Sequence, residues 1–333
     1  MIKAYGVVFP EKDEIEVLEI ELPDPGPEDV VVQTEYSGIS IGTEGWILTA
    51  KYRGTTFPLV TGYQKVGRVV QVGSQVSGLE VGDRVFLRHT KIASPIRSMW
   101  GGHTSRSVEH VGNIIKLPEG TDPVSASLLV MVAVGYHGAA ELVDVQAGEL
   151  VVVVGQGLIG QFAAQVCKQR GCTVITTEPI ALRRELSAKM GVDAALDPLS
   201  EDVEAVVRQF KAEGADVVID CSANADAINQ SFEWLKNRGS KYCFQAYYPD
   251  LTCVDMFYPH VKEMVAYFPT NVTEQGMREM LQWIADGRAQ VRPLITHIRN
   301  WRQAPELFRL MMDQPEECLG MVLDWTDAHE GES

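Results

Sequence analysis

The amino-acid sequence predicts an α/β protein of two domains, in which a β-rich front domain precedes a doubly wound parallel sheet. The length of 333 residues is enough for two domains with cores of their own. Up to residue 123 the chain consists of short runs rich in β-branched residues, broken by proline and glycine. Beyond residue 123 strand-like and helix-like segments alternate, which is typical of βαβ units.

Residues 1–123 form the predicted front domain, a small barrel or sandwich of short strands. The segments expected to contain strands are IKAYGVVF (2–9), EIEVLEIEL (14–22), DVVVQTEYSG (29–38) and LVTGYQKVGRVVQVG (59–73). The segments PDPGPED and GSQVSGLEVGDRV supply turn residues between them. We find no helical pattern of appreciable length in this part of the chain.

Residues 124–268 form the predicted second domain. Its first helix follows Asp122 and Pro123, which are a favourable N-cap and a favourable first helical residue. Leu150–Val154 is a continuous apolar run, as expected for a central strand buried on both faces. Beyond it we expect helices over 158–170, 180–190 and 224–238, and strands over 173–177, 216–220, 240–245 and 263–268.

A glycine-rich segment stands between the buried strand and the next helix, and it has the pattern G-x-G-x-x-G. Its residues are Gly155, Gln156, Gly157, Leu158, Ile159 and Gly160. The first glycine permits a tight turn, the second lets the backbone approach a pyrophosphate, and the third lets the helix pack close to the strand. The phosphates would then lie on free N–H groups at the helix N-terminus. We therefore predict a dinucleotide site here.

Glu178 ends the second strand of this domain, at the distance from Gly155 where dinucleotide-binding proteins carry an acidic residue. A carboxylate there accepts hydrogen bonds from the ribose hydroxyls and repels a 2′-phosphate, so the sequence favours NAD over NADP. Arg183 and Arg184 follow in the next helix, and a guanidinium there can accommodate a phosphate. Arg183 is thus a further candidate for cofactor binding, and NADP stays open as the alternative.

Several motifs together resemble the medium-chain dehydrogenase/reductase superfamily of alcohol, polyol and threonine dehydrogenases. They are GYQKVG (62–67), GLEVGDRV (78–85), GGHTSRSV (101–108), VVVVGQGLIGQFAAQ (151–165), TEPIALRRELSAKMGVDAALD (177–197) and PLITHIRNW (293–301). The resemblance implies a GroES-like front domain, a Rossmann domain over 124–268, and a return of residues 269–333 to the front domain. It also implies a nicotinamide cofactor, a small-molecule substrate and a homodimer formed through edge strands of two cofactor sheets.

The chain departs from the zinc-dependent members of this superfamily where they hold zinc. Ser40 stands in place of a cysteine, Tyr63-Gln64 in place of a His-Glu pair, and Val130 near the later ligand. A hydroxyl, a phenol and an alkyl group do not replace thiolate and imidazole as zinc ligands. The segment 88–100, where those members carry a four-cysteine lobe, contains no cysteine. We therefore expect neither a catalytic nor a structural zinc ion.

The segment SGISIGTE (37–44) resembles that of bacteriochlorophyllide dehydrogenases, which oxidise a hydroxyethyl group on a tetrapyrrole, and it favours alcohol/ketone chemistry. The leading hypothesis is a zinc-independent oxidoreductase that transfers a hydride between NAD and a secondary alcohol or its ketone. Two alternatives stay open. One is a quinone or enoyl reductase that reduces a conjugated C=C bond, and the other is a dinucleotide-binding sensor without turnover.

Without zinc, side chains must stabilise and protonate the alkoxide that hydride transfer creates. Tyr63 carries a hydroxyl donor at a former ligand position, and its alternative role is to fill the space that the metal left. Lys65 follows on the same face of the strand and would lower the pKa of the phenol if the two groups lie close.

Three further residues are candidates for the proton path. Thr43 and Glu44 correspond by motif to the family's Ser/Thr-Asp pair, in which the hydroxyl begins a proton relay, although Glu44 could instead be a cap carboxylate. His137 shares a helix face with Val130 and Val134 by i, i+4, i+7 spacing, so it is expected to line the cleft unless it is a structural histidine.

Charge and composition exclude several other functions. The 29 basic against 45 acidic residues give a net charge of −16, which repels nucleic-acid phosphates. No apolar run reaches the length of a membrane span. The six cysteines show no regular spacing, as in proteins of reducing compartments. We expect a cytoplasmic protein that binds neither nucleic acid nor membrane.

Overall fold

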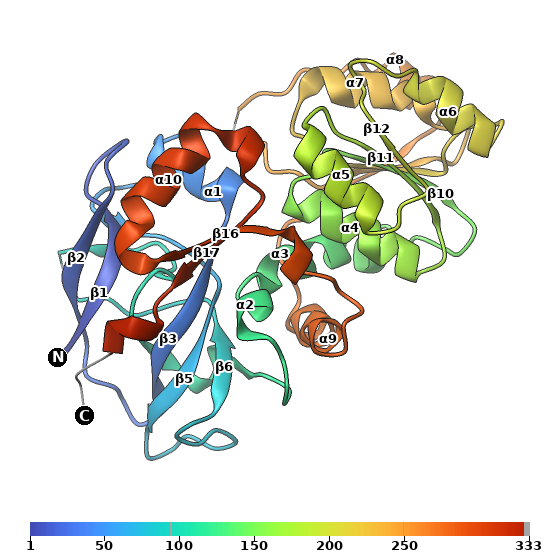
Figure 1. Ribbon diagram of the computed structural model, residues 1–333. Helices are drawn as coiled ribbons and strands as arrows, with labels where there is room; N and C mark the ends of the chain where they lie inside the picture. The colour runs from blue at the N-terminus through green and yellow to red at the C-terminus, as the bar shows by residue number, and fades with distance from the viewer. Residues whose placement is uncertain (94, 249, 330–333) are drawn as a thin grey trace. The chain divides into compact units, whose positions relative to one another are not determined.

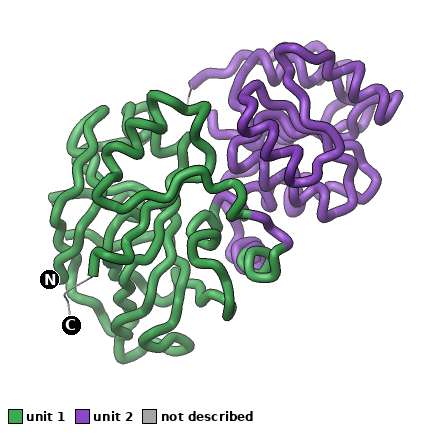
Figure 2. Tube along the Cα trace, viewed as in Figure 1, with its two compact units in different colours: residues 1–130, 281–287, 291–333 green, residues 131–280, 288–290 purple. Residues whose placement is uncertain are grey.

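The computed structural model describes residues 1–93, 95–248 and 250–329, which divide into two compact units (Figures 1 and 2). The first unit comprises residues 1–130, 281–287 and 291–333, and the second comprises residues 131–280 and 288–290. The sequence placed the limits at residues 123 and 268 instead. The first unit extends beyond residue 123 because the short helix α2 (Pro123–Ala126) packs against its strands β3 and β5.

Two sheets form the first unit, in agreement with the small barrel or sandwich that the sequence predicted. The smaller sheet has the order β2-β1-β4-β7, with β1 (Ile2–Phe9), β2 (Glu16–Leu22), β4 (Leu59–Val60) and β7 (Arg97–Ser98). The larger sheet has the order β16-β17-β3-β5-β6-β9, with β8 also paired to β3. Its strands are β3 (Asp29–Ile39), β5 (Lys65–Val72), β6 (Arg84–Leu87), β8 (Arg106–His110), β9 (Ile114–Lys116), β16 (Ile295–Asn300) and β17 (Gly320–Asp324).

The C-terminal strands complete this larger sheet, because β17 pairs antiparallel with β3 through Met321 and Ile39. The chain between β16 and β17 forms helix α10 (Ala304–Asp313). Short 3-10 turns flank these elements at Val111–Asn113, Arg292–Leu294, Trp301–Gln303, Pro315–Glu317 and Thr326–His329.

Helix α1 (Ile41–Leu48) forms in the first unit, where the sequence predicted no helix of length. Glycines and β-branched residues hide its periodicity, so local propensity does not indicate it. Tertiary packing stabilises it instead, because Ile47 and Leu48 are buried in a cluster with Phe308 and Met311 of α10.

A parallel sheet forms the centre of the second unit, in the order β12-β11-β10-β13-β14-β15, and this Rossmann-type topology confirms the predicted fold class. Its strands are β10 (Leu150–Val154), β11 (Thr173–Thr177), β12 (Ala194–Leu196), β13 (Val217–Asp220), β14 (Lys241–Phe244) and β15 (Val265–Tyr267). All five residues of β10 are buried, as expected for a central strand covered on both faces.

Helices cover this sheet. They are α4 (Leu158–Gln169), α5 (Ala181–Lys189), α6 (Val203–Phe210), α7 (Ala225–Trp234) and α8 (Phe257–Val261) (Figure 1). Helix α7 is shorter than the predicted 224–238, because Leu235 adopts an extended backbone with ψ of 148°. Helix α9 (Glu274–Ala285) follows β15. In the described ranges, no helix combines the length and apolar composition that a membrane crossing requires.

The single helix expected after Pro123 is broken into pieces. Helix α2 ends at Ala126, helix α3 (Leu129–Tyr136) follows, and a π-helical segment covers His137–Leu142. The i, i+4, i+7 spacing that placed His137 on a common face assumes a regular α-helix, so it does not hold beyond Tyr136.

Candidate active site

Three hydroxyl groups meet in the first unit, and we call Ser40, Thr43 and Tyr63 the hydroxyl cluster. Ser40 is the N-cap of α1 and Thr43 lies in its first turn, while Tyr63 stands just before β5. The phenol of Tyr63 donates a hydrogen bond to Ser40 Oγ at 2.6 Å, and Thr43 Oγ1 lies 3.5 Å from the phenol oxygen. The structure thus brings together two predicted catalytic residues, Tyr63 and Thr43, with a serine that was considered only as a lost zinc ligand.

The hydroxyl groups of the cluster are protonated near neutral pH, so they are available as hydrogen-bond donors. Burial raises the pKa of Tyr63 to about 12, although its hydrogen bonds to Ser40 and Thr43 act in the opposite direction, so the phenol stays protonated. Ser40 Oγ accepts the hydrogen bond from the phenol, and the hydroxyl of Ser40 has no acceptor of its own among the described residues. A ligand oxygen is therefore a suitable acceptor for the Ser40 proton.

A buried histidine and a buried carboxylate fix the position of the hydroxyl cluster through hydrogen bonds. His103 Nδ1 lies 2.8 Å from Ser37 Oγ, and its Nε2 lies 2.8 Å from a carboxylate oxygen of Glu44. The other Glu44 oxygen accepts the backbone N–H of Ser40 at 2.8 Å. A Cβ at Gly62 would approach the His103 ring within 2.7 Å, which explains the glycine at that position. Glu44 therefore positions Ser40, and it does so as a cap carboxylate.

The sequence predicted that Lys65 would lower the pKa of the Tyr63 phenol if the two groups lie close, and among the described residues no hydrogen bond joins them. The Lys65 ammonium donates instead to Thr90 Oγ1, to the Gly101 carbonyl at 3.0 Å and to Thr104 Oγ1 at 2.9 Å. Strand β5 begins only at Lys65, so the two-residue alternation that placed both side chains on one face does not extend back to Tyr63. Burial lowers the pKa of Lys65 to about 7.

The residues at the family's zinc positions do not fit a catalytic zinc ion. Tyr63 is a protonated phenol bonded to Ser40, and Val130 offers no side-chain donor. Gln64, which stands in place of a glutamate, accepts the backbone N–H of Val130 through its amide oxygen at 3.2 Å. Zinc sites in proteins use thiolate, imidazole or carboxylate ligands. In the part of the chain that the structure describes, no three His, Cys, Asp or Glu side chains gather in a way that could hold a metal ion.

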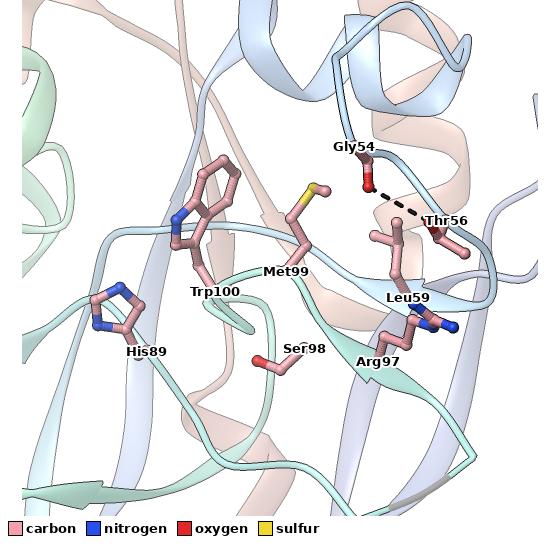
Figure 3. Close-up of a pocket in the computed structure, with 8 residues that line it drawn as sticks. All are labelled: Gly54, Thr56, Leu59, His89, Arg97, Ser98, Met99 and Trp100. Carbon is pink, nitrogen blue, oxygen red and sulfur yellow. Dashed lines mark hydrogen bonds between the residues drawn. The ribbon is translucent and has the colours of Figure 1, made fainter. Parts of the chain in front are cut away.

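A cavity of about 520 Å³ lies in the first unit, and Figure 3 shows the side chains of Leu59, His89, Met99 and Trp100 around it. Trp100 also contacts the hydroxyl cluster, because its ring packs edge-on against the ring of Tyr63 with centroids 5.2 Å apart. The backbone of Trp100 has a φ of 68°, a left-handed conformation that costs about 1 kcal/mol or more for a non-glycine residue. Such strain is typical of side chains held in place for a function.

A second cavity of about 510 Å³ lies at the carboxyl edge of the parallel sheet, at the loop from β10 to α4. Gly155 has a φ of 84°, and a Cβ at Gly160 would approach the Gly155 carbonyl oxygen within 1.9 Å, so the fold itself requires these two glycines. A Cβ at Gly157 would meet nothing within 4 Å. Since Gly157 lines the cavity, its missing side chain leaves room for a ligand rather than for the protein.

Glu178 lines the same cavity, with its carboxylate already oriented by the backbone. One oxygen accepts the N–H of Gln156 at 2.7 Å, and the other accepts the N–H of Ile180 at 3.0 Å. Each carboxylate oxygen can accept a second hydrogen bond, so both ribose hydroxyls of a dinucleotide could be bound. Arg183 also lines the cavity, whereas Arg184 is held by the carbonyl of Glu178 at 2.7 Å.

The second unit also contains His137. Its Nδ1 lies 2.6 Å from a carboxylate oxygen of Glu141, one turn further along the π-helical segment. This pairing is the local contact expected of a structural histidine, and its catalytic role stays a prediction.

The sequence reasoning missed Ser37, His103, Trp100 and Arg88 as parts of this region. The motif GGHTSR pointed to His103 without showing its direction, and no periodic pattern marks Trp100. Arg88 gives a weak signal, since a charged residue directly follows the buried strand β6.

Comparison with known proteins agrees with this architecture. Residues 26–176 match the model of the alcohol dehydrogenase GroES-like domain, and residues 159–286 match that of zinc-binding dehydrogenases. The chain is 29% identical to a 2-desacetyl-2-hydroxyethyl bacteriochlorophyllide A dehydrogenase of Rhodobacter capsulatus over 324 residues, which cover 92% of this chain and 93% of that one. It is 30% identical to an L-threonine 3-dehydrogenase of Aliivibrio salmonicida over 277 residues, or 76% and 79% of the two chains.

A solved structure shares the fold. It is a putative zinc-binding dehydrogenase from Sinorhizobium meliloti bound to NADP, with a TM-score of 0.84 and 22% identity, covering 97% of this chain and 100% of that one. Fold, glycine-rich loop and relatives together define an NAD(P)-dependent oxidoreductase. The chain belongs to the medium-chain dehydrogenase/reductase superfamily, as its motifs predicted.

Proposed function

We propose that this protein transfers a hydride between NAD(H) and a secondary alcohol or its ketone, with the hydroxyl cluster in place of a catalytic zinc ion. The observation that carries the proposal is the 2.6 Å hydrogen bond from Tyr63 to Ser40, two residues at the family's zinc positions. The similarity to a bacteriochlorophyllide A dehydrogenase supports alcohol/ketone chemistry, as the SGISIGTE segment does.

The cluster's task is to move a proton. When bound, the nicotinamide cofactor supplies or accepts the hydride. In the direction of reduction, the carbonyl carbon gains that hydride and its oxygen becomes an alkoxide, which takes the proton of Ser40 or Tyr63. The cluster then regains a proton through Thr43. Such a donor, held in place before the reaction, is worth about 10²–10³ in rate.

Zinc independence is the part of the proposal that elemental analysis tests. Because the family's ligand positions carry the hydroxyl groups of Ser40 and Tyr63 and the alkyl side chain of Val130, we expect far less than one zinc per chain and full activity in the presence of a chelator. About one zinc per chain, together with activity lost to the chelator, would overturn this part of the proposal.

We also propose that NAD is preferred over NADP. The carboxylate of Glu178 lines the cofactor cavity and is 4% exposed, so a 2′-phosphate beside it would be repelled at close range. The NADP-bound relative has the same fold, and NADP binding to this chain is the competing outcome. Titration of the purified protein with both reduced cofactors decides between them.

A quinone or enoyl reductase is the alternative reaction, and a sensor without turnover is the alternative function. NADH consumption measured with a plain ketone and with an activated enone separates them. Turnover with ketones and the reverse oxidation of secondary alcohols support the proposal. Turnover with enones alone favours the reductase, and bound cofactor with no turnover over a broad panel favours the sensor.

We propose a homodimer that pairs the edge strands β15 of two parallel sheets. Strand β15 is the last strand on its side of the sheet, and large apolar side chains near it are exposed, including Met256, Val265 and Phe268. An unpaired apolar edge of this kind is a common site of association. Light scattering should give twice the chain mass, and Val265→Lys should reduce it to the mass of one chain.

A cytoplasmic location is proposed as well. In the part of the chain that the structure describes the cysteines form no disulfide, and four of them are buried, which suits a reducing compartment. Cell fractionation with an antibody to the native protein tests it.

A further inference from the structure

Arg88 is a half-buried cation without an anionic partner. It directly follows β6, and it makes no hydrogen bond or ion pair with the residues that the structure describes. Its Nε atom is buried and has no acceptor. By contrast, Arg84 at the start of the same strand binds Glu35 with an Nε–Oε2 distance of 2.7 Å. The chain carries a net charge of −16, so its acidic side chains outnumber its basic ones and a carboxylate partner for an arginine would be expected.

A guanidinium group placed in this way costs free energy. Charged groups are seldom buried in proteins unless a partner compensates for the lost hydration. Burial lowers the pKa of Arg88, and the titratable neighbour that acts on it is the phenol of Tyr63 rather than a carboxylate. The guanidinium is therefore available to an anion from outside the chain.

Arg88 does not itself line the cavity of the candidate active site, but it directly precedes a residue that does, and it interacts electrostatically with Tyr63. The adjacent residue, His89, lines the cavity of about 520 Å³ with Trp100 (Figure 3). Tyr63, whose phenol interacts electrostatically with Arg88, belongs to the hydroxyl cluster and packs against Trp100. An anion bound by Arg88 would thus lie beside the groups that move the proton.

We propose that Arg88 binds the carboxylate of the substrate, so that the alcohol oxidised by this protein is a hydroxy acid and the corresponding ketone is an oxo acid. This inference rests on the proposed function. The planar guanidinium has donors in a fork that matches the two oxygens of a carboxylate.

The charge of the surroundings favours a monoanion over a phosphate ester. His89 contributes no charge near neutral pH, because burial lowers its pKa. The Lys65 ammonium is occupied by three protein oxygens. Arg88 is thus left as the cation available beside Tyr63, and one positive charge balances one carboxylate.

The reaction balances without a further reactant. In oxidation, the carbinol C–H bond breaks and its hydride passes to the oxidised nicotinamide cofactor. The O–H proton passes to the hydroxyl cluster, which in turn releases one of its own protons through Thr43 to solvent, and the C–O bond becomes the carbonyl of the oxo acid. The carboxylate stays unchanged on Arg88, which therefore acts in binding and orientation.

The test compares matched substrates. Steady-state kinetics are measured with 2-, 3- and 4-hydroxy acids of secondary alcohols and with the methyl ester of each, for the wild type, Arg88→Gln and Arg88→Lys. We expect the wild type to prefer at least one acid over its ester by about 10²-fold or more in kcat/KM, as for a lost charge-assisted contact. Arg88→Gln should abolish this preference by raising KM for the acid. For the esters, kcat/KM of this variant should stay within about threefold of the wild-type value. Arg88→Lys keeps the positive charge but lacks the paired N–H donors of the guanidinium, so it should recover part of the preference for the acid.

Two other arginines serve as controls. Arg309 is exposed on α10, and Arg309→Gln should leave the preference unchanged. Arg97 is exposed and also lines the cavity. If Arg97→Gln abolishes the preference while Arg88→Gln does not, the assignment to Arg88 is wrong.

Further outcomes would overturn the proposal. Equal turnover of acids and esters by the wild type excludes carboxylate recognition. If Arg88→Gln lowers kcat/KM equally for acids and esters and also weakens NADH binding, Arg88 binds the cofactor phosphates instead. A preference for glycerol 1-phosphate over every hydroxy acid identifies a phosphate site instead.

Direct binding separates this inference from the proposed function. Calorimetric titration with the oxo acids, in the presence of NAD⁺, which cannot reduce them, should show binding to the wild type and none to Arg88→Gln. If the oxo acids bind through Arg88 but no alcohol or ketone turns over, the proposed reaction fails and the anion site stands. If ketones turn over and no oxo acid binds, the anion site fails alone.

Discussion

The imidazole Nε2 of His103 and a carboxylate oxygen of Glu44 lie 2.8 Å apart, and neither side chain is exposed to solvent. The second Glu44 oxygen holds the backbone N–H of Ser40, at the start of α1. This pair therefore fixes the position of the hydroxyl cluster although it does not itself belong to it.

Removal of the His103 ring should destabilise the protein strongly. His103→Phe leaves the Glu44 carboxylate buried without its partner, which typically costs about 3–5 kcal/mol. Urea unfolding should show this loss, and the double variant His103→Phe/Glu44→Leu should lose less than the sum of the single variants. A loss below about 1 kcal/mol in His103→Phe would show that the pair does not support the site.

Replacement of Tyr63 by phenylalanine removes the donor and keeps the ring against Trp100. We expect turnover of the true substrate to fall by about 10²–10³, with cofactor affinity nearly unchanged. Thr43→Val should reduce turnover by about 10–10², and the two effects should be less than additive if both residues serve one proton path. Nearly full turnover in Tyr63→Phe would mean that the phenol only fills space, and His137 would be the next residue to test.

Glu178 should determine the choice of cofactor. Glu178→Ala removes the carboxylate that lines the cavity, so the preference for NADH over NADPH should fall at least tenfold, since one charge-assisted hydrogen bond is worth about 1.5–3 kcal/mol. Fluorescence titration of both cofactors measures the change. Equal affinities in the wild type would contradict the assigned role of Glu178.

The two glycines of the β10–α4 loop should respond differently to substitution. Gly157→Ala meets no protein atom within 4 Å, so stability should stay within about 0.5 kcal/mol while cofactor affinity falls at least tenfold. Gly160→Ala places a Cβ against the Gly155 carbonyl oxygen and should destabilise the fold itself. Unchanged cofactor affinity in Gly157→Ala would show that no ligand approaches this point.

Lys65 should make stability depend on pH. Its pKa is about 7 in the folded protein because of burial, against about 10.4 in the unfolded chain. Between these values the unfolded state binds more protons, so stability rises with pH by at most about 1.4 kcal/mol per pH unit, and the full cost of the buried charge applies below pH 7. Urea unfolding at pH 6–9 should show this slope in the wild type relative to Lys65→Met. Parallel curves for the two proteins would contradict a depressed pKa.

The sequence by itself determined the parts of this protein that depend on local patterns. The apolar run of β10, the glycines at 155 and 160 and the acidic end of β11 predict the cofactor domain, because strand burial, turn geometry and helix packing act over a few neighbouring residues. The short strands of the front domain follow from β-branched runs and turn residues in the same way.

Only the tertiary structure decided the composition of the candidate active site. Helix α1 forms because Ile47 and Leu48 pack against α10, and Lys65 turns to Thr90 and Thr104 rather than to Tyr63. These contacts join segments far apart in the sequence, so no local periodicity encodes them. The same reason applies to Arg88: that its buried Nε atom has no acceptor among the described residues is a property of its three-dimensional surroundings, which the linear order of residues does not contain.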